Sequence, residues 1–220
     1  MRALIFGWTG ETGKELVKQI KASNLFTGAT LAGRRNKGKY GLDEFFKQEI
    51  VDFEKLDSKI FEGHEHVFCL LGTTRGKAGK EGFIKVDKDY CQNIAQLSKD
   101  ANASHFHLLT SQGSNANSFF LYPQVKGQVE NFCTDLNFPK LTIYQPGLLM
   151  CDREESRTGE AIFRTIMKPF NSMLGGSSGS ISTELLAAGM LKCVETGKTG
   201  KVANKELFNL GTEFKSASSK

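Results

Sequence analysis

The sequence predicts an α/β fold in which a doubly wound parallel sheet carries helices on both faces. Three observations support this class: an apolar run meets a glycine-rich loop at the start, β-rich segments alternate with segments of helical spacing, and 220 residues suffice for one compact domain. Parallel strands need crossover connections, and these crossovers cover both faces of the sheet. We expect this single domain to span residues 1–214 and residues 215–220 to form a disordered tail.

The first βα unit lies in the opening segment MRALIFGWTGETG. An apolar run at residues 3–6 ends in a loop with Gly7, Gly10 and Gly13, and a segment of helical spacing follows. Such a loop lets the backbone approach a pyrophosphate while the helix N-terminus directs its N–H groups at the anion. An ordinary glycine turn is the alternative, but the position in the first βα unit favours a Rossmann-type dinucleotide site.

The end of the second expected strand bears on the choice between NAD and NADP. It reads Ala-Gly-Arg-Arg, with Arg34 and Arg35 where an acidic residue would bind a free ribose 2′-hydroxyl. A guanidinium forms charge-assisted hydrogen bonds to a 2′-phosphate. The pair therefore favours NADP(H), although two arginines after a strand can also be a solvated loop.

Further strands are expected at residues 50–53, 67–71, 106–109, 141–144 and 207–210, and helices at 87–100, 122–135 and 183–195. Ligands of such folds bind at the carboxyl ends of the strands. At these ends we expect Asp52 and Phe53 to meet the adenine, and Gly72 to let the backbone approach the cofactor. Pro146 and Gly147, after the sixth strand, are expected beside the nicotinamide.

A catalytic group is predicted from Ser111, Tyr122 and Lys126. Tyrosine and lysine four residues apart share one face of a helix, and Ser111 follows the fifth strand. An isolated tyrosine titrates near pH 10, so a carbonyl reductase needs a nearby ammonium to stabilise the phenolate. The lysine can also hold the nicotinamide ribose, while the serine hydroxyl binds the substrate oxygen where charge develops.

Charge, cysteine content and hydropathy indicate which binding partners and which cellular compartment to expect. The formal charge of +5 is spread along the chain, so no direct nucleic-acid partner is expected. Five cysteines without CxxC spacing indicate reduced thiols, and no apolar run reaches the roughly twenty residues of a transmembrane helix. No signal peptide precedes the first strand, so we expect a cytoplasmic protein. His105 and His107 alternate along a strand and face one side, but no third ligand is evident, so no metal site is expected.

Several motifs closely resemble the Tat-interacting oxidoreductase family of atypical short-chain dehydrogenases. They cover nearly the whole chain: GETG at 10–13, GRR at 33–35, VDFEKLD at 51–57, LGTTRGKAG at 71–79, EGF at 81–83, VKG at 125–127, PG at 146–147, CDR at 151–153 and ESR at 155–157. The resemblance implies that NADPH is bound by Thr9, Gly10, Glu11, Thr12, Arg34, Arg35, Leu71, Gly72, Tyr122 and Lys126, with contributions from Leu149 and Arg157. It also implies protein partners and a nuclear location beside the cytoplasmic one. Gln145 departs from the family pattern, since an arginine is expected before Pro-Gly.

Two functions remain open from the sequence. The first is an NADPH-dependent oxidoreductase that transfers hydride to an unidentified carbonyl compound. The second is an NADPH-sensing regulatory protein that acts through protein partners with little or no turnover. The same residues would bind NADPH in both cases.

Overall fold

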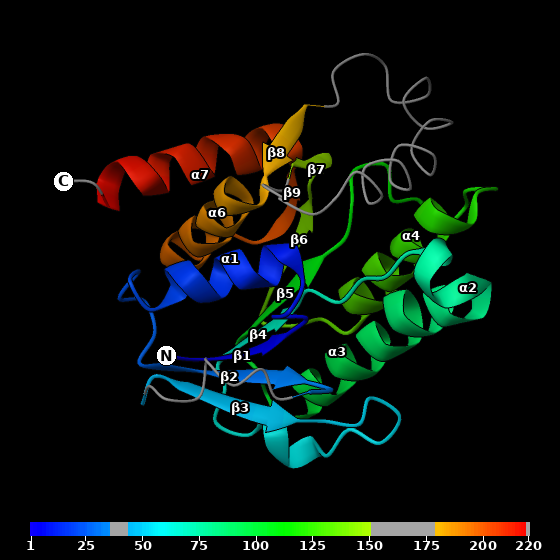
Figure 1. The fold of residues 1–220 in the computed structure, drawn as a ribbon, viewed down its shortest axis with the longest axis horizontal. Helices are drawn as coiled ribbons and strands as arrows, with labels where there is room; N and C mark the ends of the chain where they lie inside the picture. The colour runs from blue at the N-terminus through cyan, green and yellow to red at the C-terminus, as the bar shows by residue number, and fades with distance from the viewer. Residues whose placement is uncertain (36–43, 151–178, 219–220) are drawn as a thin grey trace.

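A seven-stranded parallel sheet forms the centre of the molecule in the computed structural model, which describes residues 1–35, 44–150 and 179–218 (Figure 1). Its order is β3-β2-β1-β4-β5-β6-β9. The strands are β1 Arg2–Phe6, β2 Gly28–Gly33, β3 Phe46–Ile50, β4 His66–Cys69, β5 His105–Leu109, β6 Lys140–Gln145 and β9 Gly200–Ala203. Chain order reverses between β1 and β4, where ligands of open α/β sheets bind.

Helices cover both faces of the sheet, which confirms the doubly wound class (Figure 1). One face carries α1 Glu11–Ile20, α6 Thr183–Thr196 and α7 Asn204–Ser218; the other carries α2 Arg75–Ile84, the π-helical turn η2 Lys85–Asp89, α3 Tyr90–Asp100 and α4 Leu121–Asp135. The described residues also form three short elements: the 3₁₀ turn η1 Ser58–Phe61 and the strands β7 Leu148–Met150 and β8 Ser180–Ser182, which pair in parallel.

Side-chain alternation along β1 builds a separate apolar core on each face. Ala3 and Ile5 pack into the cluster under α1 and α6, whereas Leu4 and Phe6 pack into the cluster under α3 and α4. Each of these four side chains is fully buried. A strand buried on both faces reads as a continuous apolar run, and that is why the first strand could be recognised from the sequence.

The expected strand at 207–210 is wrong, because these residues lie inside α7. Leu207 and Phe214 are seven residues apart, on the face that α7 turns toward α6, and both are buried. A four-residue apolar run does not by itself distinguish a strand from a buried helix turn. The last strand is β9 instead. Because α7 continues to Ser218, residues 215–218 are helical, and the expectation that they form a disordered tail is wrong.

The expected strand at 50–53 begins and ends earlier, as β3. Val51 still donates one hydrogen bond, from its N–H to the carbonyl of Gly33. Asp52 then turns the chain, because its Oδ1 accepts a hydrogen bond from the N–H of Glu54 at 3.0 Å. The other expected strands and helices are confirmed with shifts of a few residues at their ends.

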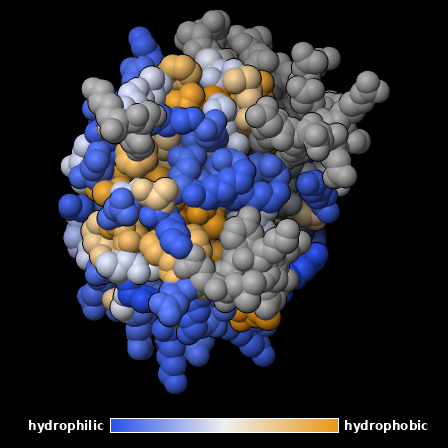
Figure 2. Space-filling view, turned by 60° about the vertical axis from the view of Figure 1, so that its left-hand side comes forward, coloured by the Kyte–Doolittle hydropathy of each residue, from blue (hydrophilic) through white to orange (hydrophobic). Residues whose placement is uncertain are grey.

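The surface on the side of both chain ends is mostly hydrophilic, and apolar residues show through it in separate groups (Figure 2). Within the described ranges, no helix combines the length and the apolar character that crossing a membrane requires.

Candidate functional site

The loop between β1 and α1 is shaped by two glycines that accept no side chain. Gly7 has φ 82°, and a Cβ on it would lie 2.4 Å from the carbonyl oxygen of Leu70. A Cβ on Gly13 would lie 2.3 Å from the carbonyl oxygen of Gly7, so α1 starts directly against the loop. This close packing fixes where the helix N-terminus points.

The N-terminus of α1 fits an anionic ligand. Gly10 is the N-cap, no side chain caps the first turn, and both Thr9 and Gly10 are exposed. Backbone N–H groups at such a terminus bind phosphate oxygens. Glu11 is half-buried and Thr12 is buried, so the expected contacts at Thr9 and Gly10 are the accessible ones in this turn.

Trp8 is buried in this loop and lies against the end of β2. Only 2% of its surface is exposed, and its Nε1 would be 2.9 Å from a Cβ placed on Gly33. Arg34 and Arg35 follow directly and are both exposed. The arginine pair and the glycine loop therefore stand at neighbouring strand ends, as expected from the sequence.

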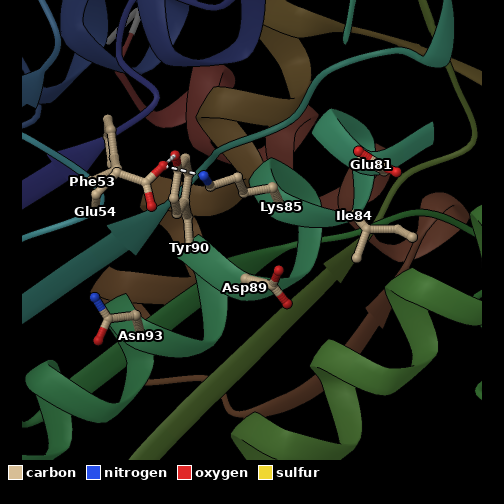
Figure 3. Close-up of a pocket in the computed structure, with 8 residues that line it drawn as sticks. All are labelled: Phe53, Glu54, Glu81, Ile84, Lys85, Asp89, Tyr90 and Asn93. Atoms are coloured by element: carbon tan, nitrogen blue, oxygen red, sulfur yellow. Dashed lines mark hydrogen bonds and ion pairs between the residues drawn. The ribbon is translucent and has the colours of Figure 1, made fainter. Parts of the chain in front are cut away.

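A cavity of about 510 Å³ lies beside Phe53, one of the two residues expected at the adenine (Figure 3). Its lining comes from the turn after β3 and from α2, η2 and α3: Phe53, Glu54, Glu81, Ile84, Lys85, Asp89, Tyr90 and Asn93. The Phe53 ring stacks on Tyr90 with centroids 5.2 Å apart. The other expected residue, Asp52, is exposed and does not line this cavity.

Glu54 connects the two sides of the cavity. Its carboxylate accepts a hydrogen bond from the Tyr90 hydroxyl at 2.5 Å and forms an ion pair with Lys85 (Figure 3). The hydrogen bond to Glu54 and burial raise the pKa of Tyr90, while the charges of Lys85 and Arg34 lower it.

The expected pair Tyr122 and Lys126 lies on α4, where a third residue holds the lysine. Lys126 Nζ is 2.8 Å from Asp87 Oδ1, and the two side chains are 7% and 1% exposed. Asp87 Oδ2 also accepts a hydrogen bond from the N–H of Thr73 at 2.7 Å, which ties the loop after β4 to this pair. Burial alone would lower the pKa of Lys126. The charges of Asp87 and Tyr122 act in the opposite direction and outweigh burial, so the pKa lies above its usual range. The contact with Asp87 therefore favours the charged form of Lys126.

Asp87 was not singled out from the sequence. It lies four and seven residues before Cys91 and Ile94, two buried positions of the following helix. A buried acidic residue needs a cation or several hydrogen-bond donors. An acidic residue in line with the apolar positions of a helix could therefore have identified Asp87 as a site residue. The cation comes from α4, so only the tertiary structure identifies it.

Ser111 lies in the loop after β5 and is buried. In the part of the chain that the structure describes, its Oγ has no hydrogen-bond partner. The loop is fixed on both sides: the N–H of Gln112 donates to the carbonyl of Pro146 at 2.8 Å, and the N–H of Asn115 donates to that of Pro123 at 2.9 Å. These bonds hold Ser111 between the end of β6 and the first turn of α4, where Tyr122 stacks on Phe83.

The remaining expected residues lie around the same strand ends. Pro146 is buried, and the N–H of Gly147 donates to Asn204 Oδ1 at 2.8 Å. Leu71 is half-buried and Gly72 is exposed after β4, while Leu149 is half-buried in β7. Arg157 lies outside the described residues.

The statement that no third ligand accompanies His105 and His107 is corrected by the structure. His66, from the neighbouring strand β4, places a third imidazole beside them. These side chains lie at the amino ends of the strands, away from the cofactor loops.

The chain is similar to proteins from a mammal and from fungi. It is 42% identical to protein HTATIP2 of Rattus norvegicus over 95% of this chain and 88% of that one. It is 33% identical to the mitochondrial protein FMP52-1 of Scheffersomyces stipitis over 71% of each chain. The expected cytoplasmic and nuclear location is overturned by such fungal relatives, several of which are named mitochondrial proteins.

Solved structures share the fold at low sequence identity. A putative NAD-dependent epimerase/dehydratase from Bacillus halodurans matches with a TM-score of 0.71 and 17% identity, over 97% of this chain and 99% of that one. UDP-glucuronic acid 4-epimerase from Bacillus cereus, solved with UDP-glucuronic acid and NAD, matches with a TM-score of 0.72 and 15% identity over 93% and 77%. No protein-family model matches the chain. The Rossmann-type sheet and the extent of the 42% identity establish that the chain belongs to the family of the Tat-interacting protein HTATIP2, with a short-chain-dehydrogenase-like fold.

Proposed function

We propose that this protein binds NADP(H) and reduces a carbonyl compound by hydride transfer. The observation that carries the proposal is the buried ion pair of Lys126 with Asp87 of η2, since Lys126 shares one face of α4 with Tyr122. A reductase of this type needs such an ammonium, since it lowers the cost of forming a tyrosinate.

Cofactor binding is supported by the glycine loop and the arginine pair. The uncapped N-terminus of α1 offers N–H groups to a pyrophosphate, and the fold neighbours include enzymes solved with NAD. Arg34 and Arg35 are exposed at the end of β2 and have no ion pair within the described ranges. They can bind a ribose 2′-phosphate, which is why we favour NADP(H) over NAD(H).

We place the adenine beside Phe53, at the rim of the adjacent cavity. Three carboxylates and one ammonium line that cavity, so its charge disfavours phosphate and suits a neutral purine with an exocyclic amine. The phosphates then lie on the side of the glycine loop. This arrangement assigns separate places to the charged and uncharged parts of one dinucleotide.

In the proposed reaction the bound dinucleotide supplies the hydride, and the protein handles the proton. Tyr122 donates its phenolic proton to the carbonyl oxygen, and Lys126 stabilises the resulting phenolate. The Oγ of Ser111 donates a hydrogen bond to the same oxygen, where negative charge develops. Asp87 acts through Lys126, because it keeps the ammonium charged and in place.

The test measures NADPH binding by calorimetry and NADPH oxidation with a panel of aldehydes and ketones. We expect Tyr122→Phe to keep NADPH affinity and abolish turnover, and Lys126→Met to weaken both. Lys99→Met is the matched control, since Lys99 is on α3 and its Nζ donates to the carbonyl of Asn137. Unchanged affinity and turnover in Lys126→Met would overturn the assignment of the lysine.

A regulatory role without turnover is the second candidate, and one surface feature favours it. Phe119 is fully exposed and Phe120 is 46% exposed, directly before the helix that carries Tyr122. Exposed aromatic side chains beside a ligand site suit contact with a protein partner. NADPH binding without oxidation of NADPH by any carbonyl of the panel would favour this role over catalysis.

A further inference from the structure

Three buried histidines gather at the amino edge of the sheet, on the side opposite the cofactor loops. His66 and His105 are paired first residues of β4 and β5, and His107 follows two residues later on the same face. The side chains are 6%, 1% and 0% exposed. Figure 1 shows the strands running from the side of the N-terminus toward the opposite edge, so the histidines and the catalytic group lie at different ends.

The spacing of the imidazole nitrogens is close to that of a metal site. His66 Nδ1 and His107 Nε2 are 3.0 Å apart, and one nitrogen from each of the three rings lies within 4.8 Å of the others. Two imidazole nitrogens bound to a tetrahedral Zn²⁺ are each about 2.0–2.1 Å from the ion and hence about 3.3 Å from each other. Since the nitrogens lie up to 4.8 Å apart, the rings must approach one another by up to about 1.5 Å to bind one ion.

Each ring is held on its other nitrogen by an outer partner. The hydroxyl of Thr142 donates to the carbonyl of Lys198 at 2.6 Å, so it accepts from His105 Nε2–H at 2.7 Å and leaves His105 Nδ1 as the lone-pair donor. Met1 Sδ lies 3.2 Å from His66 Nε2 and can only accept, which leaves His66 Nδ1 unprotonated. Partners of this kind fix the orientation of metal-binding histidines.

The third ring, His107, can adopt the ligand tautomer without gaining or losing a proton. Its Nε2–H now donates to His66 Nδ1, and its Nδ1 is 2.8 Å from the Tyr144 hydroxyl. If the proton moves to Nδ1, the Tyr144 hydroxyl turns to accept a hydrogen bond from Nδ1–H, and Nε2 becomes a ligand. All three rings are buried, and neutral imidazole is the form that binds metals.

We propose that His66, His105 and His107 form a binding site for one divalent transition-metal ion, with Zn²⁺ as the representative of its class. Three neutral imidazoles suit Zn²⁺, Cu²⁺ or Ni²⁺ better than Mg²⁺ or Ca²⁺, which prefer oxygen ligands. A water completes the coordination. Met1 Sδ contacts His66 Nε2 and Met1 is 45% exposed, so a movement of this one side chain would open a path for the ion. The ion joins β4 to β5 and stabilises the folded state.

The competing interpretation is a linear chain of hydrogen bonds from Tyr144 through His107 and His66 to Met1 that needs no ion. To distinguish them, chelator-treated full-length protein is titrated with ZnCl₂ in competition with a chromophoric chelator. We expect one equivalent to bind, with a rise in melting temperature and, for CoCl₂, the absorption of a tetrahedral site. Absence of stoichiometric Zn²⁺ binding by the wild-type protein overturns the proposal and supports the hydrogen-bond chain.

Three variants complete the design. His66→Leu removes one of the three ligands and should abolish stoichiometric binding of Zn²⁺. Tyr144→Phe keeps the shape of the core and removes an outer partner, so it should weaken binding about 10- to 100-fold even if His66→Leu fails to fold. His64→Gln is the matched control, because His64 Nε2 bonds to Thr30 Oγ1 at 2.8 Å and lies outside the cluster. Equal Zn²⁺ affinity in wild type and Tyr144→Phe, or loss of binding in His64→Gln, contradicts the assignment.

Discussion

Replacing Asp87 by asparagine tests the buried ion pair that defines the candidate site. The change keeps the side-chain shape and an oxygen for the N–H of Thr73, but it removes the charge that faces Lys126 at 2.8 Å. Removing one partner of a buried pair costs about 3–5 kcal/mol, because the other charge is left uncompensated. We expect the low end, about 3 kcal/mol, since asparagine remains polar. For a chain of this size that corresponds to a fall in melting temperature of about 6–12 °C.

The loss of folding stability in Asp87→Asn should decrease as pH rises. In the wild type the pKa of Lys126 is raised by Asp87, so its stabilising contribution is complete below the unfolded value of about 10.4 and is lost as pH rises above it. In Asp87→Asn the main opposing charge is removed, so burial, the largest influence, lowers the pKa of Lys126, and the penalty of the buried charge is relieved as pH rises toward about 10.4. The gap in stability between the two proteins should therefore be largest near neutral pH and shrink between about pH 8 and pH 11.

Urea unfolding of both proteins across this pH range measures the gap. Asp89→Asn is the matched control, since Asp89 lies two residues away, its side chain is 53% exposed, and its ion pair with Lys88 has a separation of 3.4 Å. We expect that variant to change stability by less than about 1 kcal/mol at every pH. A gap for Asp87→Asn that stays constant with pH, or one no larger than that of Asp89→Asn, would refute the reasoning.

Three further predictions concern the cofactor. NADPH should bind more tightly than NADH by at least about 1–3 kcal/mol, and calorimetry of Arg34→Ala or Arg35→Ala should show that preference collapse, while equal affinities in the wild type contradict the assignment of these arginines. NADPH should quench the fluorescence of Trp8, the single tryptophan, by energy transfer, and a flat titration on fully bound protein would reject a cofactor beside this loop. Gly13→Ala should lower both melting temperature and NADPH affinity, because its Cβ would lie 2.3 Å from a carbonyl oxygen, whereas Gly72→Ala, with no atom nearer than 3.6 Å, should melt like the wild type.

Local signals in the sequence were sufficient for the fold class and for much of the site. A strand buried on both faces, a glycine loop and a helix follow one another in the first twenty residues, and each depends on short-range sterics and periodicity. Tyr122 and Lys126 are on the same face of a helix because they are four residues apart. Residues 207–210 were misassigned for the same reason, since an isolated apolar run carries no information about its neighbour, α6.

The tertiary structure alone decided which distant residues meet. Asp87 finds its cation on α4, 39 positions along the chain, and His66 finds His107 on the next strand, 41 positions away. These contacts depend on strand order and register, which no local pattern specifies. The composition also did not show that a carboxylate and three imidazoles would be buried, because burial follows from the packing of whole helices and strands. Burial in turn determines the chemistry of these polar groups.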